Sequence, residues 1–169
     1  MSAAPIDLKF VSSDNKEFLI PSDVIKMSST VNTLLTDLGL EDLKTTNGEA
    51  IPLHNVDAKT LKKVIAWCKH HHENPAPVAS VNVEEESNNN ALSDYAIEFF
   101  KISQTEIFEL ILAANYLNIE GLLDAGCKTI ASMMKGLSPQ ELCEKFEIVN
   151  DFTPEEQEAI RKENAWCED

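Results

Sequence analysis

Apolar and polar residues alternate at the start of the chain and predict a β-hairpin. In residues 6–11, IDLKFV, apolar side chains alternate with polar ones, which is typical of a half-buried strand. The turn-forming stretch SSDNK follows at 12–16, and EFLI at 17–20 supplies a second short strand. A third short strand is expected at 51–53, after a polar, loop-like stretch at 41–49.

Other apolar residues in this half recur at the spacing of a helix. One helical pattern opens at Pro21 and Ser22 and continues to Leu38, where Gly39 fits the stop. A second begins after Asp57, whose side chain can cap it. We expect this second helix to fray in the histidine run at 70–72, before a proline.

The periodicity then breaks for twenty residues. The stretch 74–93, NPAPVASVNVEEESNNNALS, is rich in Pro, Asn, Ser and Glu and has no sustained period. This composition predicts a disordered acidic insert that adds nothing to the core.

Three helix starts in the second half carry the same signature. The pairs that form capping boxes are Ser103 with Glu106, Ser138 with Glu141, and Thr153 with Glu156. In the last two, Pro139 or Pro154 occupies the first helical position, where a missing amide costs nothing.

These helices differ in how much apolar surface they carry. The helix from Ser103 is apolar nearly all round, so we expect it to be buried on most sides. The segment 122–134 carries more apolar surface than one neighbour covers. After Leu137 the apolar residues are few, large and surrounded by charge. They either close the core or face a partner, and Trp166, three residues from the end, favours a binding anchor.

Charge and composition narrow the classes of partner. The formal net charge of −15 disfavours nucleic acid and acidic membrane surfaces and favours basic protein surfaces. No stretch approaches the ~20 apolar residues of a membrane span, and the N-terminus lacks a secretory pattern. The four cysteines are widely scattered, so we expect reduced thiols in a cytoplasmic or nuclear protein.

No catalytic motif stands out. The chain has no phosphate-binding glycine loop, no GxSxG, no HExxH and no CxxC, so we expect no catalytic residue, metal or cofactor. Cys68 and His72 are one helical turn apart and could share a metal, but a polar helix end also accounts for them. Cys127 and Cys143 have the spacing of core or interface residues.

Three segments resemble a known family. They are FELILAANYLNIEGLLDAGCKTIASMMKG at 108–136, NDFTPEEQEAIRKENAWCED at 150–169 and LKKVIAWCKHHHENPAP at 61–77. Each is similar to the S-phase-kinase-associated adaptors of SCF (cullin plus F-box) ubiquitin ligases. The resemblance implies an α+β fold of the BTB/POZ type at 1–135, followed by a C-terminal helical extension at 136–169.

The resemblance also implies partners and contact residues. Asn115 and Tyr116 match the pair that contacts the cullin N-terminal region. The apolar positions that match the F-box groove are Leu123, Cys127, Ile130, Met134, Phe146, Ile148 and Trp166. Pro154 stands where some members carry a modified proline, although a helix-start proline needs no modification.

Two other adaptor or chaperone functions remain open at this stage. An elongin-C-like adaptor would end near the BTB/POZ core, whereas this chain continues into further helices. A chaperone of basic proteins would release its cargo as ionic strength rises, whereas groove binding would persist. A weak homodimer of the free adaptor is also expected, because an empty apolar groove can self-associate.

Overall fold

The computed structural model describes residues 7–37, 50–75, 92–149 and 151–164. Two compact units divide the chain, Met1–Ala131 and Ser132–Asp169. The domain boundary that the sequence predicts, after residue 135, stays a prediction.

A three-stranded sheet lies in the first unit. Strands β1 (Asp7–Ser12) and β2 (Glu17–Pro21) pair antiparallel, and β3 (Ile51–Leu53) pairs parallel to β1, so the order is β2-β1-β3. The hairpin and the third strand are therefore confirmed. At the hairpin turn, Asn15 has a φ of 58°, a left-handed conformation that asparagine tolerates better than most residues.

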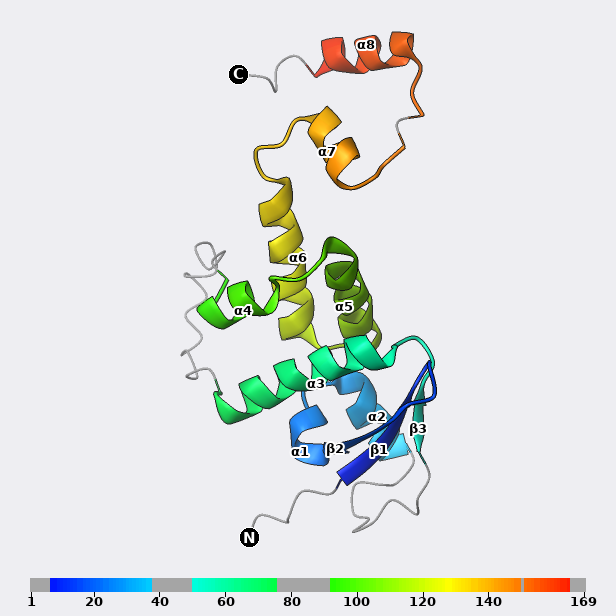
Figure 1. The fold of residues 1–169 in the computed structure, drawn as a ribbon, viewed down its shortest axis with the longest axis vertical. Helices are drawn as coiled ribbons and strands as arrows, with labels where there is room; N and C mark the ends of the chain where they lie inside the picture. The colour runs from blue at the N-terminus through cyan, green and yellow to red at the C-terminus, as the bar shows by residue number, and fades with distance from the viewer. Residues whose placement is uncertain (1–6, 38–49, 76–91, 150, 165–169) are drawn as a thin grey trace. The chain divides into compact units, whose positions relative to one another are not determined.

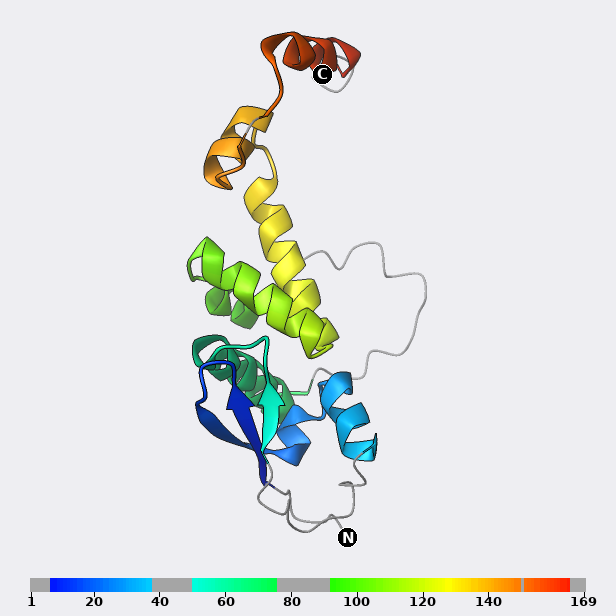
Figure 2. The ribbon, with the colours of Figure 1, turned by 90° about the vertical axis from the view of Figure 1, so that its right-hand side faces the viewer.

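Six helices are described alongside the sheet. They are α1 (Ser22–Ile25), α2 (Ser29–Asp37), α3 (Ala58–Glu73), α4 (Asp94–Phe99), α5 (Gln104–Tyr116) and α6 (Glu120–Met134). In Figures 1 and 2, α3 lies between the sheet with α1 and α2 on one side and α5 on the other. It contributes Leu61, Val64 and Trp67 to the core, each at most 2% exposed. The prediction that Asp57 caps α3 is confirmed, because its carboxylate accepts from the Thr60 amide at 2.9 Å.

The prediction of a single helix from Pro21 to Leu38 is wrong, because the helix is interrupted between Ile25 and Ser29. Ser28 is fully buried at the break. Its hydroxyl donates to the Leu117 carbonyl at 2.5 Å and accepts from the Val31 amide at 3.2 Å. A hydrogen bond to a residue 89 positions away therefore accompanies a break in the helix, although the helical pattern of apolar residues is continuous in the sequence. Leu38 and Gly39 lie outside the described residues.

The expected fraying of the histidine run is also wrong. Helix α3 continues through all three histidines to Glu73, and Asn74 caps it. The ring of His70 stacks on Tyr95 of α4, with 3.4 Å between centroids. His71 bonds through Nδ1 to the Trp67 carbonyl at 3.0 Å. Contacts with a helix beyond the insert therefore support this end of α3.

The ends of the predicted insert belong to helices. Asn74 is the C-cap of α3, and the Ser93 hydroxyl caps α4 by accepting from the Ala96 amide. The rest of the predicted insert, at 76–91, lies outside the described residues.

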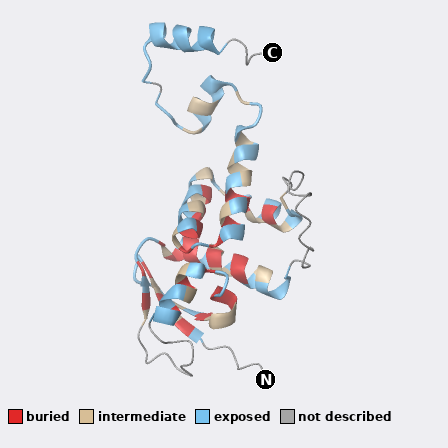
Figure 3. Ribbon diagram, turned by 180° about the vertical axis from the view of Figure 1, so that it is seen from behind, coloured by how far each residue is buried: buried red, intermediate tan, exposed pale blue. Residues whose placement is uncertain are grey.

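The second unit contains α7 (Pro139–Lys145) and α8 (Pro154–Glu163). All three predicted capping boxes are confirmed, at the starts of α5, α7 and α8. Neither α7 nor α8 has a buried residue, as Figure 3 shows. None of the described helices combines the length and apolar character needed to cross a membrane.

Candidate protein-binding surfaces

Helix α5 buries only one side, which corrects the expectation that it is buried on most sides. Ile107, Leu110 and Ala114 face the core and are at most 1% exposed. On another side, Phe108 is 41% exposed and Leu112 is 68% exposed. Two large apolar residues on a charged protein are a candidate contact surface for another protein.

Helix α6 presents a second group of apolar residues. Leu123, Cys127 and Ile130 recur at helical spacing, so they share one flank of the helix. Leu123 and Ile130 are half-buried and Cys127 is exposed. For Cys127, of the two roles that the sequence left open, this exposure favours an interface.

The two groups flank a close contact between α5 and α6. A Cβ atom built on Gly126 would lie 2.6 Å from Cγ1 of Ile111, so any larger residue at 126 would force the Ile111 side chain to shift. Phe108 precedes Ile111 by three residues and Cys127 follows Gly126 directly. We call the exposed and half-exposed apolar residues on this side of the two helices the α5–α6 face: Phe108, Ile111, Leu112, Leu123, Cys127 and Ile130.

The candidates predicted from the sequence include the α6 half of this face but not the α5 half. The missed residues are Phe108, Ile111 and Leu112. The signal was present, because a helix that is apolar nearly all round has more apolar surface than one core requires. The pattern alone does not tell which side remains uncovered.

The remaining candidates for F-box contact belong to the second unit. Met134 ends α6 and is 40% exposed, Phe146 is the half-buried C-cap of α7, and Ile148 is 55% exposed. Val149, Phe152 and Ile160 are exposed as well, although sequence reasoning did not select them as contacts. Trp166 lies outside the described residues.

Asn115 and Tyr116 form the last turn of α5. Asn115 is exposed and Tyr116 is half-buried. The backbone around them is tied to α2, since the Thr30 hydroxyl donates to the Tyr116 carbonyl at 3.1 Å. The pair is therefore presented from a fixed helix end.

Cys68 and His72, the candidate metal ligands, have other surroundings in the structure. Cys68 is fully buried, and burial raises the pKa of its thiol to about 11, which disfavours the thiolate form that binds metals. His72 pairs with Asp23 at 3.3 Å. Within the described ranges, no cluster of three or more His, Cys, Asp or Glu side chains could hold a metal ion.

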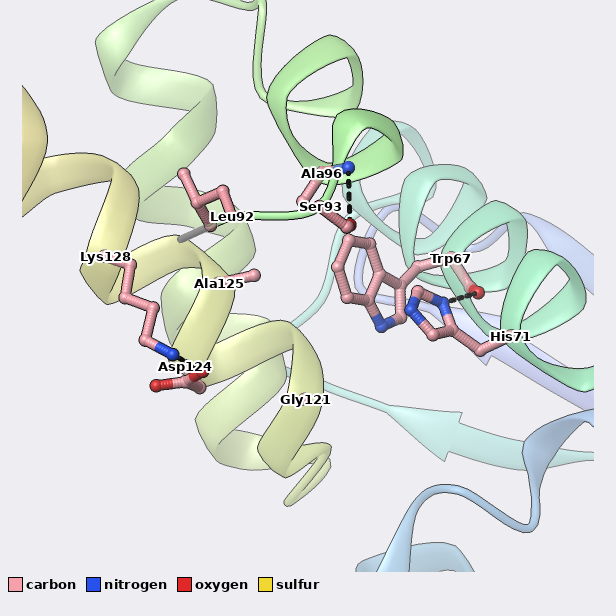
Figure 4. A pocket seen from close by; sticks show the side chains of 9 residues that line it. All are labelled: Trp67, His71, Leu92, Ser93, Ala96, Gly121, Asp124, Ala125 and Lys128. Carbon is pink, nitrogen blue, oxygen red and sulfur yellow. Dashed lines mark hydrogen bonds and ion pairs between the residues drawn. The ribbon is translucent and has the colours of Figure 1, made fainter. Parts of the chain in front are cut away.

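A small pocket of about 160 Å³ lies between α3, the start of α4 and α6, as Figure 4 shows. Its polar groups are engaged in structural contacts: Asp124 pairs with Lys128 at 2.8 Å, Ser93 caps α4, and His71 bonds the Trp67 carbonyl. The indole nitrogen of Trp67 is covered from solvent and has no hydrogen-bond partner among the described residues. We find no catalytic arrangement in this pocket.

Pro154 occupies the first turn of α8, directly after the Thr153 cap. The helix-start role is therefore confirmed. Modification of Pro154 stays a prediction.

Comparison with known proteins gives matches in both halves of the chain. Residues 7–73 match the tetramerisation domain of the Skp1 family, and residues 120–167 match the dimerisation domain of the same family. The first match, a POZ-type domain, covers β1 to α3 and confirms the predicted α+β fold of the BTB/POZ type.

Relatives that align with nearly the whole chain indicate the same family. The chain is 55% identical to a Skp1-related protein of Caenorhabditis elegans, over 96% of this chain and 92% of that protein. It is 45% identical to the SCF ubiquitin ligase complex protein SKP1a of Dictyostelium discoideum, over 96% of each. It is 44% identical to the E3 ubiquitin ligase complex SCF subunit sconC of Arthroderma otae, over 99% of this chain and 98% of that protein. With both domain matches and nearly full coverage by these relatives, the chain belongs to the Skp1 family.

Proposed function

We propose that this chain is the adaptor subunit of an SCF-type ubiquitin ligase. It bridges an F-box substrate receptor to a cullin scaffold, so that target proteins are ubiquitinated and degraded, and it performs no chemistry itself. One observation carries the proposal. A protein whose relatives are named as SCF subunits exposes an apolar face on α5 and α6 and ends α5 with the Asn115–Tyr116 pair.

The α5–α6 face is the proposed site for the F-box. Its apolar residues are spread over two adjacent helices, the arrangement that receives an amphipathic helix. In the second unit, the large apolar residues Ile148 and Phe152 are exposed in the segment between α7 and α8, and Ile160 is exposed on α8. Short helices without a buried residue gain most of their stability from packing, so a receptor would stabilise them on binding.

The last turn of α5 is the proposed site for the cullin N-terminal region. Asn115 offers an exposed amide, and Tyr116 offers an aromatic ring with a polar tip, a residue type common among interface anchors. The adaptor is expected in the cytoplasm and the nucleus, where its cysteines stay reduced.

Paired binding assays test the two sites separately. The wild type should bind both a cullin N-terminal fragment and an F-box receptor. The double variant Asn115→Lys, Tyr116→Lys should lose only the cullin fragment, because two added charges at the helix end prevent close packing. Leu112→Arg, or Trp166→Ala at a position outside the described residues, should weaken only binding to the F-box receptor.

The sheet offers a matched control for Leu112→Arg. Leu19 on β2 is also 68% exposed, so Leu19→Arg places the same charge on an equally exposed leucine away from α5. It should bind both partners as the wild type does. Wild-type protein that binds neither partner would overturn the adaptor proposal, and equal losses for Leu19→Arg and Leu112→Arg would overturn the F-box assignment.

A further inference from the structure

Three consecutive residues with hydroxyl side chains, at the start of α2, form hydrogen bonds with the end of α5. Ser28 donates to the Leu117 carbonyl at 2.5 Å, and Thr30 donates to the Tyr116 carbonyl at 3.1 Å. The Ser29 hydroxyl accepts from the Asn118 side-chain amide, and the Ser29 backbone amide donates to the Asn118 carbonyl at 3.4 Å. We call this set the α2–α5 clasp: Ser28, Ser29, Thr30, Tyr116, Leu117 and Asn118.

The clasp supplies partners that a helix end lacks. The last carbonyls of an α-helix have no amide partner within the helix. At α5 the chain turns back through Asn118, whose φ is 48°, and the Asn118 and Ile119 amides bond the carbonyls of Asn115 and Ala114. The carbonyls of Tyr116 and Leu117 are then the acceptors for the hydroxyls at the start of α2.

These bonds hold the backbone at and beside Asn115 and Tyr116, the two residues that we propose contact the cullin. Thr30 bonds the backbone of Tyr116 itself, and Ser28 bonds the next residue. The last turn of a helix frays unless other contacts hold it. A frayed turn must be ordered when a partner binds, and that ordering weakens affinity.

We propose that Ser29 and Thr30 are positioning residues for cullin binding, although neither needs to touch the cullin. They hold the last turn of α5 in the conformation that presents Asn115 and Tyr116. This assignment rests on the proposed function. It adds that cullin affinity depends on α2 through the clasp.

Threonine-to-valine substitutions on α2 provide a test with a close control. Thr30→Val removes the hydroxyl that bonds Tyr116 and keeps the branched shape. Thr33→Val makes the same change three residues later, where the hydroxyl bonds only the Ser29 carbonyl of its own helix. In calorimetric titrations with a cullin N-terminal fragment, Thr30→Val should bind about three- to tenfold more weakly than wild type, the value of one net hydrogen bond. Thr33→Val should bind as wild type, and Thr30→Ser should restore affinity.

A second pair of variants tests the side-chain contact between Ser29 and Asn118. Ser29→Ala removes the acceptor, and Asn118→Gly removes the donor while glycine keeps the left-handed φ without strain. Each should weaken cullin binding to a similar extent. The double variant should be no weaker than either single variant, because both remove the same contact.

Binding to an F-box receptor separates positioning from general stability. The clasp variants should bind that receptor as wild type, and their melting temperatures should fall by no more than the loss of one hydrogen bond implies. Equal losses for both partners would overturn the positioning role and leave a purely structural one. Unchanged cullin affinity in Thr30→Val and Ser29→Ala would overturn the inference while the adaptor function stands. A wild type that fails to bind the cullin fragment would overturn the proposed function and this assignment with it.

Discussion

Two glycines of α6 lie in different surroundings. A Cβ built on Gly121 meets nothing within 4 Å, whereas one on Gly126 meets Ile111 at 2.6 Å. Change to alanine adds helix propensity, and this gain is larger at the interior position Gly126 than at Gly121 in the first turn. We expect Gly126→Ala to be less stable than Gly121→Ala by about 1–3 kcal/mol, the usual cost of overpacking.

Chemical denaturation of the two variants measures this difference directly. Gly126→Ala should cost less stability in an Ile111→Ala background than in the wild type, because Ile111→Ala removes the atoms that the new methyl group meets. If Gly126→Ala is as stable as Gly121→Ala, the contact between α5 and α6 is less constrained than its geometry indicates.

At the scale of the elements, one ion pair links α3 to the start of α5. Lys59 meets Glu106 at 2.8 Å, and Glu106 also closes the capping box with Ser103. The hydrogen bonds from Lys59 and then Ser103 lower the pKa of Glu106 from 4.5 to about 2. Because the folded pKa lies below the unfolded one, the stabilisation is present above pH 4.5 and is lost as pH falls toward about 2.

Glu106→Gln tests this pH dependence. Glutamine can still close the capping box, so the variant chiefly loses the charge that faces Lys59. Near neutral pH the wild type should melt at a higher temperature than the variant, and the gap should close as pH falls from 4.5 to about 2. The lowered pKa of Asp14 is common to both proteins and cancels in the difference. A gap that stays constant across this range would contradict the prediction.

The elements also show which parts of the fold the sequence predicts well. The helix starts at Ser103, Ser138 and Thr153 depend on residues three positions apart, so they could be predicted from local sequence alone. The break at Ser28 could not, because it depends on a bond to Leu117 far along the chain. The same limit applies to α5, where tertiary packing decides that one apolar side is buried and another is exposed.

The sequence likewise indicates only some residues of the candidate site. Leu123, Cys127 and Ile130 were selected because the segment resembles a family groove, and their exposure or half-exposure fits a surface role. Residues on the exposed side of α5 were missed because a pattern that is apolar nearly all round does not identify the uncovered side. The hydroxyls of Ser29 and Thr30 gave no signal at all, since serine and threonine near a helix start usually indicate only a cap.

For the whole molecule, the exposed apolar surface predicts self-association of the free adaptor. The α5–α6 face is exposed or half-exposed in the described part of the first unit, and one matched domain is described as a dimerisation domain. We expect sedimentation velocity to show a weak, concentration-dependent homodimer that an F-box receptor dissociates by competing for the same face. Leu112→Arg should weaken this dimer, and Leu19→Arg should leave it unchanged.

A strict monomer at high concentration would contradict the prediction of a homodimer. A dimer that persists in the presence of an F-box receptor would place the contact on another surface. Either result would leave the adaptor function itself intact.

The capping boxes of α7 and α8 have a consequence for the order of folding during synthesis. Each box closes between a Ser or Thr and a Glu three positions later, and the helix behind it buries no residue. Nothing in the first unit is needed to mark where these helices begin. This segment leaves the ribosome after α1 to α5 have already emerged. Its helix starts are therefore defined as soon as they leave the exit tunnel. The helices themselves become stable only when a receptor packs against them.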